Sequence, residues 1–150
     1  MSCCGTLCYV RPHPRRKHLT FRLPGPTLER LDARAHQIRE SRTGLAERYL
    51  EEGLRMDEHP GIGFADGPTG RRAVLTGTGL DVWEVVGTVK QSGGSVAAAA
   101  RYLELAPAQV RSAVRYYAAF PAEVDDMLAR QVRAAEQEEE AAGGERAAMG

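Results

Sequence analysis

The sequence predicts a mainly α-helical protein that carries a short β-ribbon, and three patterns support this fold class. Apolar and polar residues alternate through HLTFRL at residues 18–23, as they do in a strand with one buried face. Most of the chain after Pro26 repeats its apolar residues at the spacing of amphipathic helices. Glycine and proline interrupt residues 57–79, where two short apolar runs predict a small hairpin.

The beginning of the chain contains a predicted tail, the strand and two helices. Residues 1–17 are polar and aperiodic, and we expect them to be disordered. The next segment covers residues 18–57, where Pro26 suits the first turn of a helix that ends near Glu40. Ser41 then offers a cap for a second helix. The apolar stripes of these helices are Leu28, Leu31, Ala35 and Ile38 in the first, and Leu45, Tyr49, Leu50 and Leu54 in the second.

The middle of the chain combines the hairpin with three helical patterns. The apolar runs 62–65 and 73–75 flank the turn DGPTG. A helix near residues 81–92 follows, Ser95 caps the next helix and Pro107 opens the third. The last two helices have the outline of a helix-turn-helix, whose second helix enters a DNA groove in many proteins, although units of this shape also pack against proteins alone. The candidate DNA contacts on or near one face of that helix are Gln109, Arg111, Ser112 and Arg115.

The end of the chain, residues 129–150, is predicted to be an acidic helical extension that becomes a disordered tail. The helix that runs into this segment is expected to start earlier, at Pro121. It carries a narrow apolar stripe of Val124, Met127, Leu128 and Val132. A glutamate-rich helix could fill an electropositive site of a partner. The candidate contacts are Glu138, Glu139 and Glu140. Alternatively, the stripe packs on the protein's own helix-turn-helix and the glutamates are solvated.

Composition argues against a membrane protein, while the total charge argues neither for nor against a nucleic-acid partner. The formal net charge is +0, so total charge favours no class of partner, although the first 22 residues are basic and the glutamate-rich end is acidic. No apolar run approaches the roughly 20 residues that a membrane span needs. The first residues lack the order of a signal peptide, so we expect a cytoplasmic protein with no membrane partner.

Motifs that would indicate an enzyme or a metal site are also missing. Cys3, Cys4 and Cys8, even with His13, do not have a zinc-binding spacing, so we expect no metal and no other cofactor. The stretches GPTGRR and GTG lack the Gly-Lys-Ser/Thr end of a phosphate-binding loop and are better explained as turns. The histidines are scattered and suggest no catalytic set. We therefore expect no enzyme.

The strand at residues 18–23 needs a partner, because a lone strand has two unpaired edges. A second copy of the chain can supply one, so we expect a homodimer in which two strands pair about a two-fold axis. The residues expected in the shared core are Leu19, Phe21 and Leu23. The outer face of such a ribbon fits the DNA major groove, and its candidate contacts are His18, Thr20 and Arg22. In the alternative, the strand caps the downstream domain.

Amide groups at the start of the second helix, near Arg42 and Thr43, would suit a DNA phosphate. The stretches LTFRL, LERLDARAHQI and SRTGLAERYL in this segment resemble the ribbon-helix-helix family of bacterial antitoxins and repressors. The resemblance implies an obligate dimer that reads operator DNA with alternate strand residues. The chain departs from the family pattern at Glu40, where a glycine often separates the helices, and at Gly44 inside the first turn of the second helix.

Residues 59–128 resemble an uncharacterised domain family of bacterial antitoxin-like proteins, through the stretches GIGFADGPTGRRAVLTGTGLDVWEVV and GGSVAAAARYLELAPAQVRSAVRYYAAFPAEVD. Members are commonly encoded beside a toxin that resembles PIN-domain ribonucleases. Together, the two resemblances suggest a VapB-type antitoxin. They imply a dimer that binds operator DNA, represses its own operon and neutralises a ribonuclease-like toxin encoded nearby. The rival interpretation is a protein-interaction module for dimerisation and toxin capture, without sequence-specific DNA binding.

Overall fold

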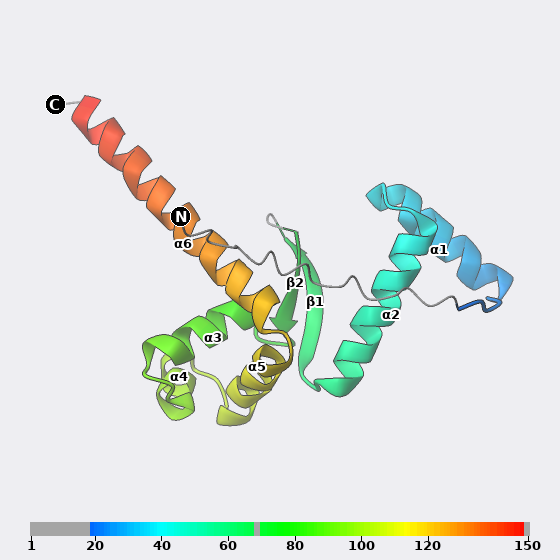
Figure 1. Ribbon diagram of the computed structural model, residues 1–150, viewed down its shortest axis with the longest axis horizontal. Coiled ribbons are helices and arrows are strands. Elements are labelled where there is room, and N and C mark those ends of the chain that lie inside the picture. The colour runs from blue at the N-terminus through cyan, green and yellow to red at the C-terminus, as the bar shows by residue number, and fades with distance from the viewer. Residues whose placement is uncertain (1–18, 68–69, 149–150) are drawn as a thin grey trace, which may run out of the picture. The chain divides into compact units, whose positions relative to one another are not determined.

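A computed structural model of the chain describes residues 19–67 and 70–148 (Figure 1). These residues form six helices and one two-stranded antiparallel sheet, which confirms the predicted mainly α class with a short β element. The chain divides into two compact units, Met1–Arg42 and Thr43–Gly150, and each is described by itself. The predicted disordered tail at 1–17 and the candidate contact His18 lie outside the described residues.

The described part of the first unit contains one helix, α1 (Gly25–Ile38). Its predicted apolar stripe is its least exposed face, and Ala35 is buried. The helix ends before the predicted Glu40, because Arg39 adopts a left-handed conformation with φ 56° and its N–H bonds back to the last turn.

The predicted strand is not formed in the single chain, where residues 19–24 have no regular secondary structure. A strand exists only when its backbone groups pair with those of a neighbouring strand, and the described part of the first unit contains no other strand. Leu19 and Phe21 are accordingly 75% and 50% exposed. The prediction that these residues pair between two copies stays a prediction.

The second unit begins with α2 (Arg42–Glu58) and continues with the predicted hairpin of β1 (Ile62–Gly67) and β2 (Gly70–Leu75). The strands pair in register from Ile62 opposite Leu75 to Gly67 opposite Gly70. Period-two alternation turns Ile62, Ala73 and Leu75 into the core.

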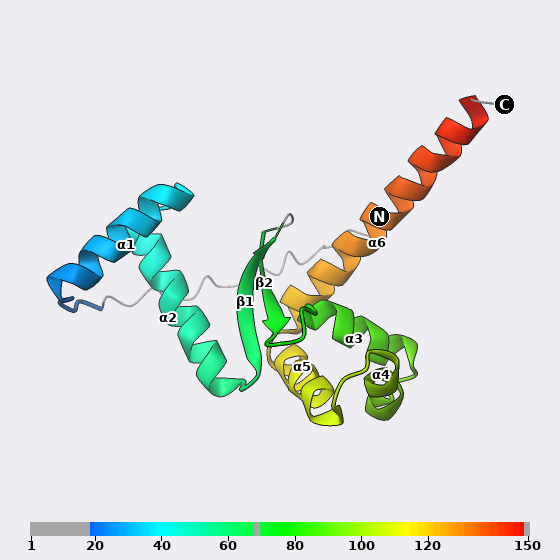
Figure 2. The ribbon, with the colours of Figure 1, turned by 180° about the vertical axis from the view of Figure 1, so that it is seen from behind.

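Three helices follow the hairpin close to their predicted positions: α3 (Val82–Gln91), α4 (Val96–Tyr102) and α5 (Pro107–Ala119). The predicted cap is confirmed at Ser95, whose Oγ accepts a hydrogen bond from the Ala98 N–H at 3.2 Å. The three helices pack against one another, and the hairpin lies against α3 and α5 (Figures 1 and 2). The core between them is largely aliphatic and includes Val82, Val85, Val86, Ala99 and Val110.

The last helix, α6 (Pro121–Ala148), has a packed beginning and an exposed stretch after it. Val124 is buried and Leu128 packs against the core, where the absence of a side chain at Gly87 admits Leu128. The helix continues into the tail that was predicted to be disordered, because alanine and glutamate propagate a helix once its packed beginning has formed. Residues 132–142 are exposed.

Candidate nucleic-acid interface

The α4–α5 pair is joined by a tight turn at residues 103–106, which fixes the direction of α5. Glu104 adopts the left-handed conformation with φ 55°, and the Leu105 N–H donates to the Ala100 carbonyl at 2.9 Å. Leu103 and Leu105 then turn back into the core on either side of Glu104. The start of α5 is therefore held by both hydrogen bonds and apolar packing.

The outward face of α5 is cationic. Arg111 and Arg115 are four residues apart, so they project from the same side of the helix, and both are exposed. The other exposed residues on that side are uncharged: Pro107, Ala108, Ala118 and Ala119. No acidic residue occurs in residues 105–122. Neither guanidinium is hydrogen-bonded or ion-paired to any described residue, so both remain available to a partner.

Two of the four candidate contacts on this helix are already engaged. The Gln109 Oε1 accepts the Ala106 N–H at 2.9 Å, and the Ser112 Oγ donates to the Ala108 carbonyl at 3.3 Å. Both side chains are also partly buried. The sequence predicted their place on the helix but not these local bonds, which satisfy the backbone at the start of α5.

The inward face of α5 is anchored by Tyr116, which is fully buried. Its hydroxyl donates to Glu123 at 2.9 Å and accepts from the Arg55 Nη1 at 3.1 Å. Arg55 also binds Glu123 at 2.7 Å and lies 4.0 Å from the centre of the Phe120 ring. Burial, reinforced by the charge of Glu123, raises the pKa of Tyr116 above the usual tyrosine range. The sequence gave no signal for this network, because its members are up to 68 positions apart.

A second polar junction joins α2 to the hairpin. The Arg71 guanidinium donates to both carboxylate oxygens of Glu52, at 2.8 and 2.7 Å. Arg48 adds a longer ion pair to the same carboxylate, at 3.6 Å. These pairs and the Arg55 network explain why α2 belongs to the second unit, whereas the sequence prediction grouped it with α1.

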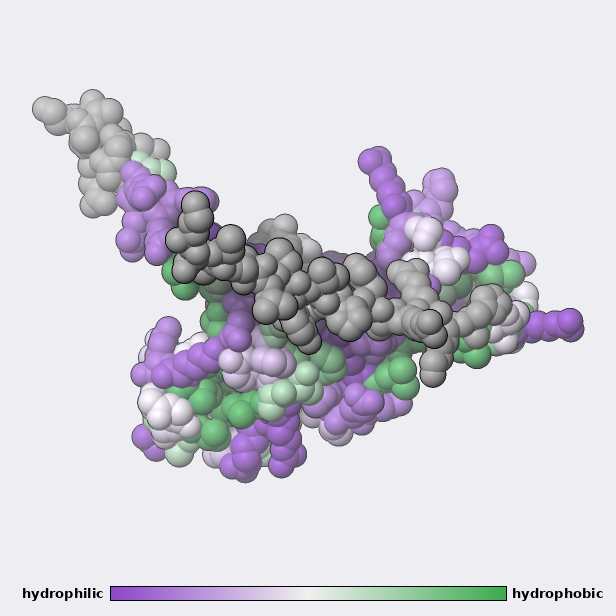
Figure 3. Space-filling view, viewed as in Figure 1, coloured by the Kyte–Doolittle hydropathy of each residue, from purple (hydrophilic) through white to green (hydrophobic). Residues whose placement is uncertain are grey.

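The apolar stripe of α2 is mostly on the outside. Tyr49, Leu50 and Leu54 are 44%, 50% and 59% exposed, and Leu45 alone of the predicted stripe is buried. The polar side chains Arg48, Glu52 and Arg55 occupy a partly buried face, on the side of the helix away from Leu50 and Leu54. Elsewhere in the second unit, hydrophobic residues gather at the surface over α3 and α4 in the space-filling view (Figure 3). Helix α2 therefore presents an apolar surface that the described residues of the chain leave uncovered.

The remaining candidate contacts belong to other parts of the chain. Thr20 and Arg22 are exposed residues of the first unit. Arg42 is ion-paired with Asp32, so part of its charge is neutralised, and Thr43 is exposed in the first turn of α2. The glutamates proposed for toxin binding, Glu138, Glu139 and Glu140, are exposed on α6. The apolar stripe that precedes them instead packs on the chain's own core through Val124 and Leu128, as the alternative interpretation expected.

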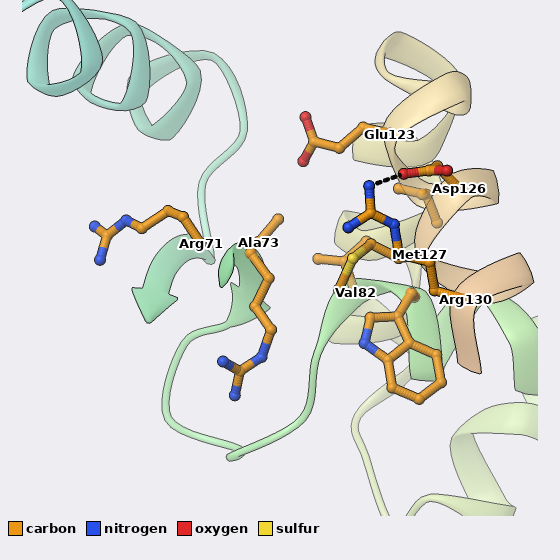
Figure 4. Close-up of a pocket in the computed structure, with 10 residues that line it drawn as sticks. Arg71, Ala73, Val82, Glu123, Asp126, Met127 and Arg130 are labelled. Atoms are coloured by element: carbon orange, nitrogen blue, oxygen red, sulfur yellow. Dashed lines mark ion pairs between the residues drawn. The ribbon is translucent and has the colours of Figure 1, made fainter. Parts of the chain in front are cut away.

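A small pocket of about 180 Å³ lies among β2, α3 and α6 (Figure 4). Its charged lining residues are mostly paired: Asp126 binds Arg130 at 2.7 Å, and Glu123 binds Arg55. Arg72, which also lines the pocket, binds the buried Asp81, and Asp81 accepts the Trp83 indole N–H at 2.9 Å. Among the described residues no group of three His, Cys, Asp or Glu side chains could hold a metal ion. The Arg72–Asp81 ion pair therefore joins β2 to the start of α3, and the described lining of the pocket suggests no set of catalytic side chains.

Comparison with protein-family models, with characterised proteins and with solved structures finds no match to this chain. The function must therefore be argued from its surfaces. No helix in the described ranges is long and apolar enough to cross a membrane.

Proposed function

We propose that the chain is an antitoxin that binds operator DNA as a dimer and neutralises a PIN-like ribonuclease. The observation that carries the DNA-binding part is the cationic face of α5, with Arg111 and Arg115 exposed and unpaired among the described residues. In a helix-turn-helix the second helix lies in the major groove, where an arginine bonded to guanine is among the commonest specific contacts, and arginines also bind phosphates. We assign that role to α5.

Dimer formation is supported by the apolar surfaces that a single copy exposes. Leu19 and Phe21 in the first unit, and Leu50 and Leu54 on α2, each leave half or more of their surface in water. A second copy would cover such residues and would supply the missing strand partner at residues 18–23. In that dimer the outer face of the ribbon would carry His18, Thr20 and Arg22.

Toxin neutralisation rests on the resemblance of the chain to antitoxin-like proteins and on the exposed acidic stretch of α6. Glutamates on a projecting helix suit an electropositive nuclease site by charge complementarity. If Glu138, Glu139 and Glu140 cap that site, their joint change to glutamine keeps the fold and weakens neutralisation, most clearly at low ionic strength, where their charges are least screened.

Binding to the chain's own promoter DNA tests the central part of the proposal. Fluorescence anisotropy with the full-length protein should show binding that weakens steeply as salt rises, and Arg111→Ala with Arg115→Ala should abolish most of it. Arg133→Ala, which removes an exposed arginine of α6, is the matched control and should retain binding. Unaltered affinity in the double variant would remove α5 from the interface.

The rival function, a protein-interaction module without DNA binding, is favoured by the uncovered stripe of α2. It predicts co-purification with a neighbouring gene product and no salt-dependent binding to promoter DNA. The same purified protein therefore separates the two functions.

A further inference from the structure

We infer that α5 reads guanine, with Arg111 and Arg115 as its specificity-determining residues. This inference rests on the proposed DNA-binding function and names the base that the interface selects. Among the polar side chains on or near the outward side of α5, Gln109 and Ser112 are engaged in local bonds, which leaves the two guanidinium groups. The face can donate hydrogen bonds through them, but a guanidinium has no acceptor.

A donor-only face discriminates among bases because of the pattern that each base shows in the major groove. Guanine presents two adjacent acceptors, N7 and O6, whereas adenine presents one acceptor beside a donor and cytosine presents a donor. An arginine fork matches the guanine pair with two parallel bonds. Each available arginine on α5 is therefore suited to one guanine.

The spacing of the two arginines sets the spacing of the guanines. Arg111 and Arg115 are four positions apart, which is about 6 Å along a helix axis. Successive bases on one strand are about 3.4 Å apart, so the two side chains reach bases about two steps apart. The alanines on the same side, Ala108, Ala118 and Ala119, leave room for the helix to approach the base edges.

The inner side of α5 is held firmly enough to aim these side chains. Tyr116 is fully buried and bonded to both Arg55 and Glu123, which come from α2 and α6. A helix fixed from two sides presents its outward arginines in one orientation, which base reading requires and general attraction to phosphates does not.

Selection from a pool of random duplex DNA, with the full-length protein and sequencing of the bound fraction, tests the inference. We expect two enriched guanines about two steps apart. Arg111→Ala should remove the preference at one position and Arg115→Ala at the other, each weakening binding to the selected duplex by about 5- to 150-fold. Arg111→Lys keeps the charge but loses the fork, so it should keep the salt dependence and weaken the preference. Arg133→Ala should retain both.

The outcomes separate this inference from the function on which it rests. Salt-dependent binding without guanine enrichment, or a preference that persists in all α5 variants, overturns the inference and leaves DNA binding intact. A preference that disappears only in Arg22→Ala would assign base reading to the first unit. No binding to any duplex at low salt overturns both. Circular dichroism of each variant establishes that the fold is retained.

Discussion

Helices α5 and α2 are both amphipathic, but α5 buries its apolar side, whereas α2 leaves most of its apolar residues exposed. α5 buries Val110, Ala113 and Tyr116 and turns its arginines outward. α2 turns Arg48, Glu52 and Arg55 toward its own chain and leaves Tyr49, Leu50 and Leu54 at the surface. No residue of α2 belongs to the main apolar core cluster of the described chain. An apolar stripe thus identifies the face that needs covering, but not what covers it.

The largest expected effect is on the buried side of α5. Tyr116→Ala should lower the free energy of unfolding by about 3–5 kcal/mol, because it empties a fully buried aromatic site. Tyr102→Ala is the matched control, since its ring is 78% exposed. Urea denaturation followed by circular dichroism measures both. A small loss at Tyr116 would mean that α5 is not anchored as described.

The next effect concerns the exposed stripe of α2. If a partner copy covers it, Leu50→Ala with Leu54→Ala should weaken self-association by at least about 2 kcal/mol, the value of burying a leucine side chain. The isolated chain should unfold at nearly the same urea concentration. Analytical ultracentrifugation across a dilution series reads out the association. Val132→Ala, at an exposed position of α6, should not change it.

Arg55→Ala should cost about 1–2 kcal/mol of stability. Charged hydrogen bonds contribute about 1.5–3 kcal/mol, and the contribution is reduced here because Glu123 is partly exposed to water. The control is Arg130→Ala, whose exposed pair with Asp126 should contribute less than about 0.5 kcal/mol. Thermal unfolding at two salt concentrations distinguishes them, since an equal response would mean that the Arg55 network is an ordinary surface pair.

The Tyr116 hydroxyl makes stability depend on alkaline pH. Its pKa is raised in the folded chain, so the unfolded chain loses the proton first, and the free energy of unfolding should fall as pH rises above about 10. Tyr116→Phe should cost about 1 kcal/mol at neutral pH, for the lost hydrogen bonds. The variant should also lose most of the alkaline decline, which denaturation between pH 7 and 11 would reveal. An unchanged decline would assign it to another group.

The smallest expected effect is a gain. Glu104 holds a left-handed conformation that costs a side-chain-bearing residue about 1–2 kcal/mol, while glycine adopts it freely but is more disordered when unfolded. Glu104→Gly should therefore stabilise the chain by about 0.5 kcal/mol net, measurable as a small rise in the unfolding midpoint. A clear loss would show that the Glu104 side chain contributes to the turn.

Local signals predicted much of the fold. The hairpin followed from DGPTG, and the starts of α4, α5 and α6 followed from Ser95, Pro107 and Pro121, because caps and turns depend on neighbouring residues. The sequence also predicted that Arg111 and Arg115 share one face of the helix, because residues four apart lie on the same side. The orientation of α2 was not predictable, since it depends on contacts such as Arg55 with Tyr116, which are 61 positions apart. The hydrogen bonds of Gln109 and Ser112 were not predicted either, because apolar periodicity shows only the side of the helix on which a residue lies.

The polar attachment of α2 has a consequence for hydrogen exchange. Because α2 contributes no residue to the core cluster and is joined to it by arginine pairs, it can open without unfolding α3, α4 and α5. The amide protons of α2 should then exchange with solvent through a sub-global opening. Those of α5 should exchange only through global unfolding, and therefore more slowly. Raised ionic strength should widen that difference, since it weakens ion pairs more than aliphatic packing. The second unit would then unfold in two cooperative steps, with α2 opening before the core of α3, α4 and α5.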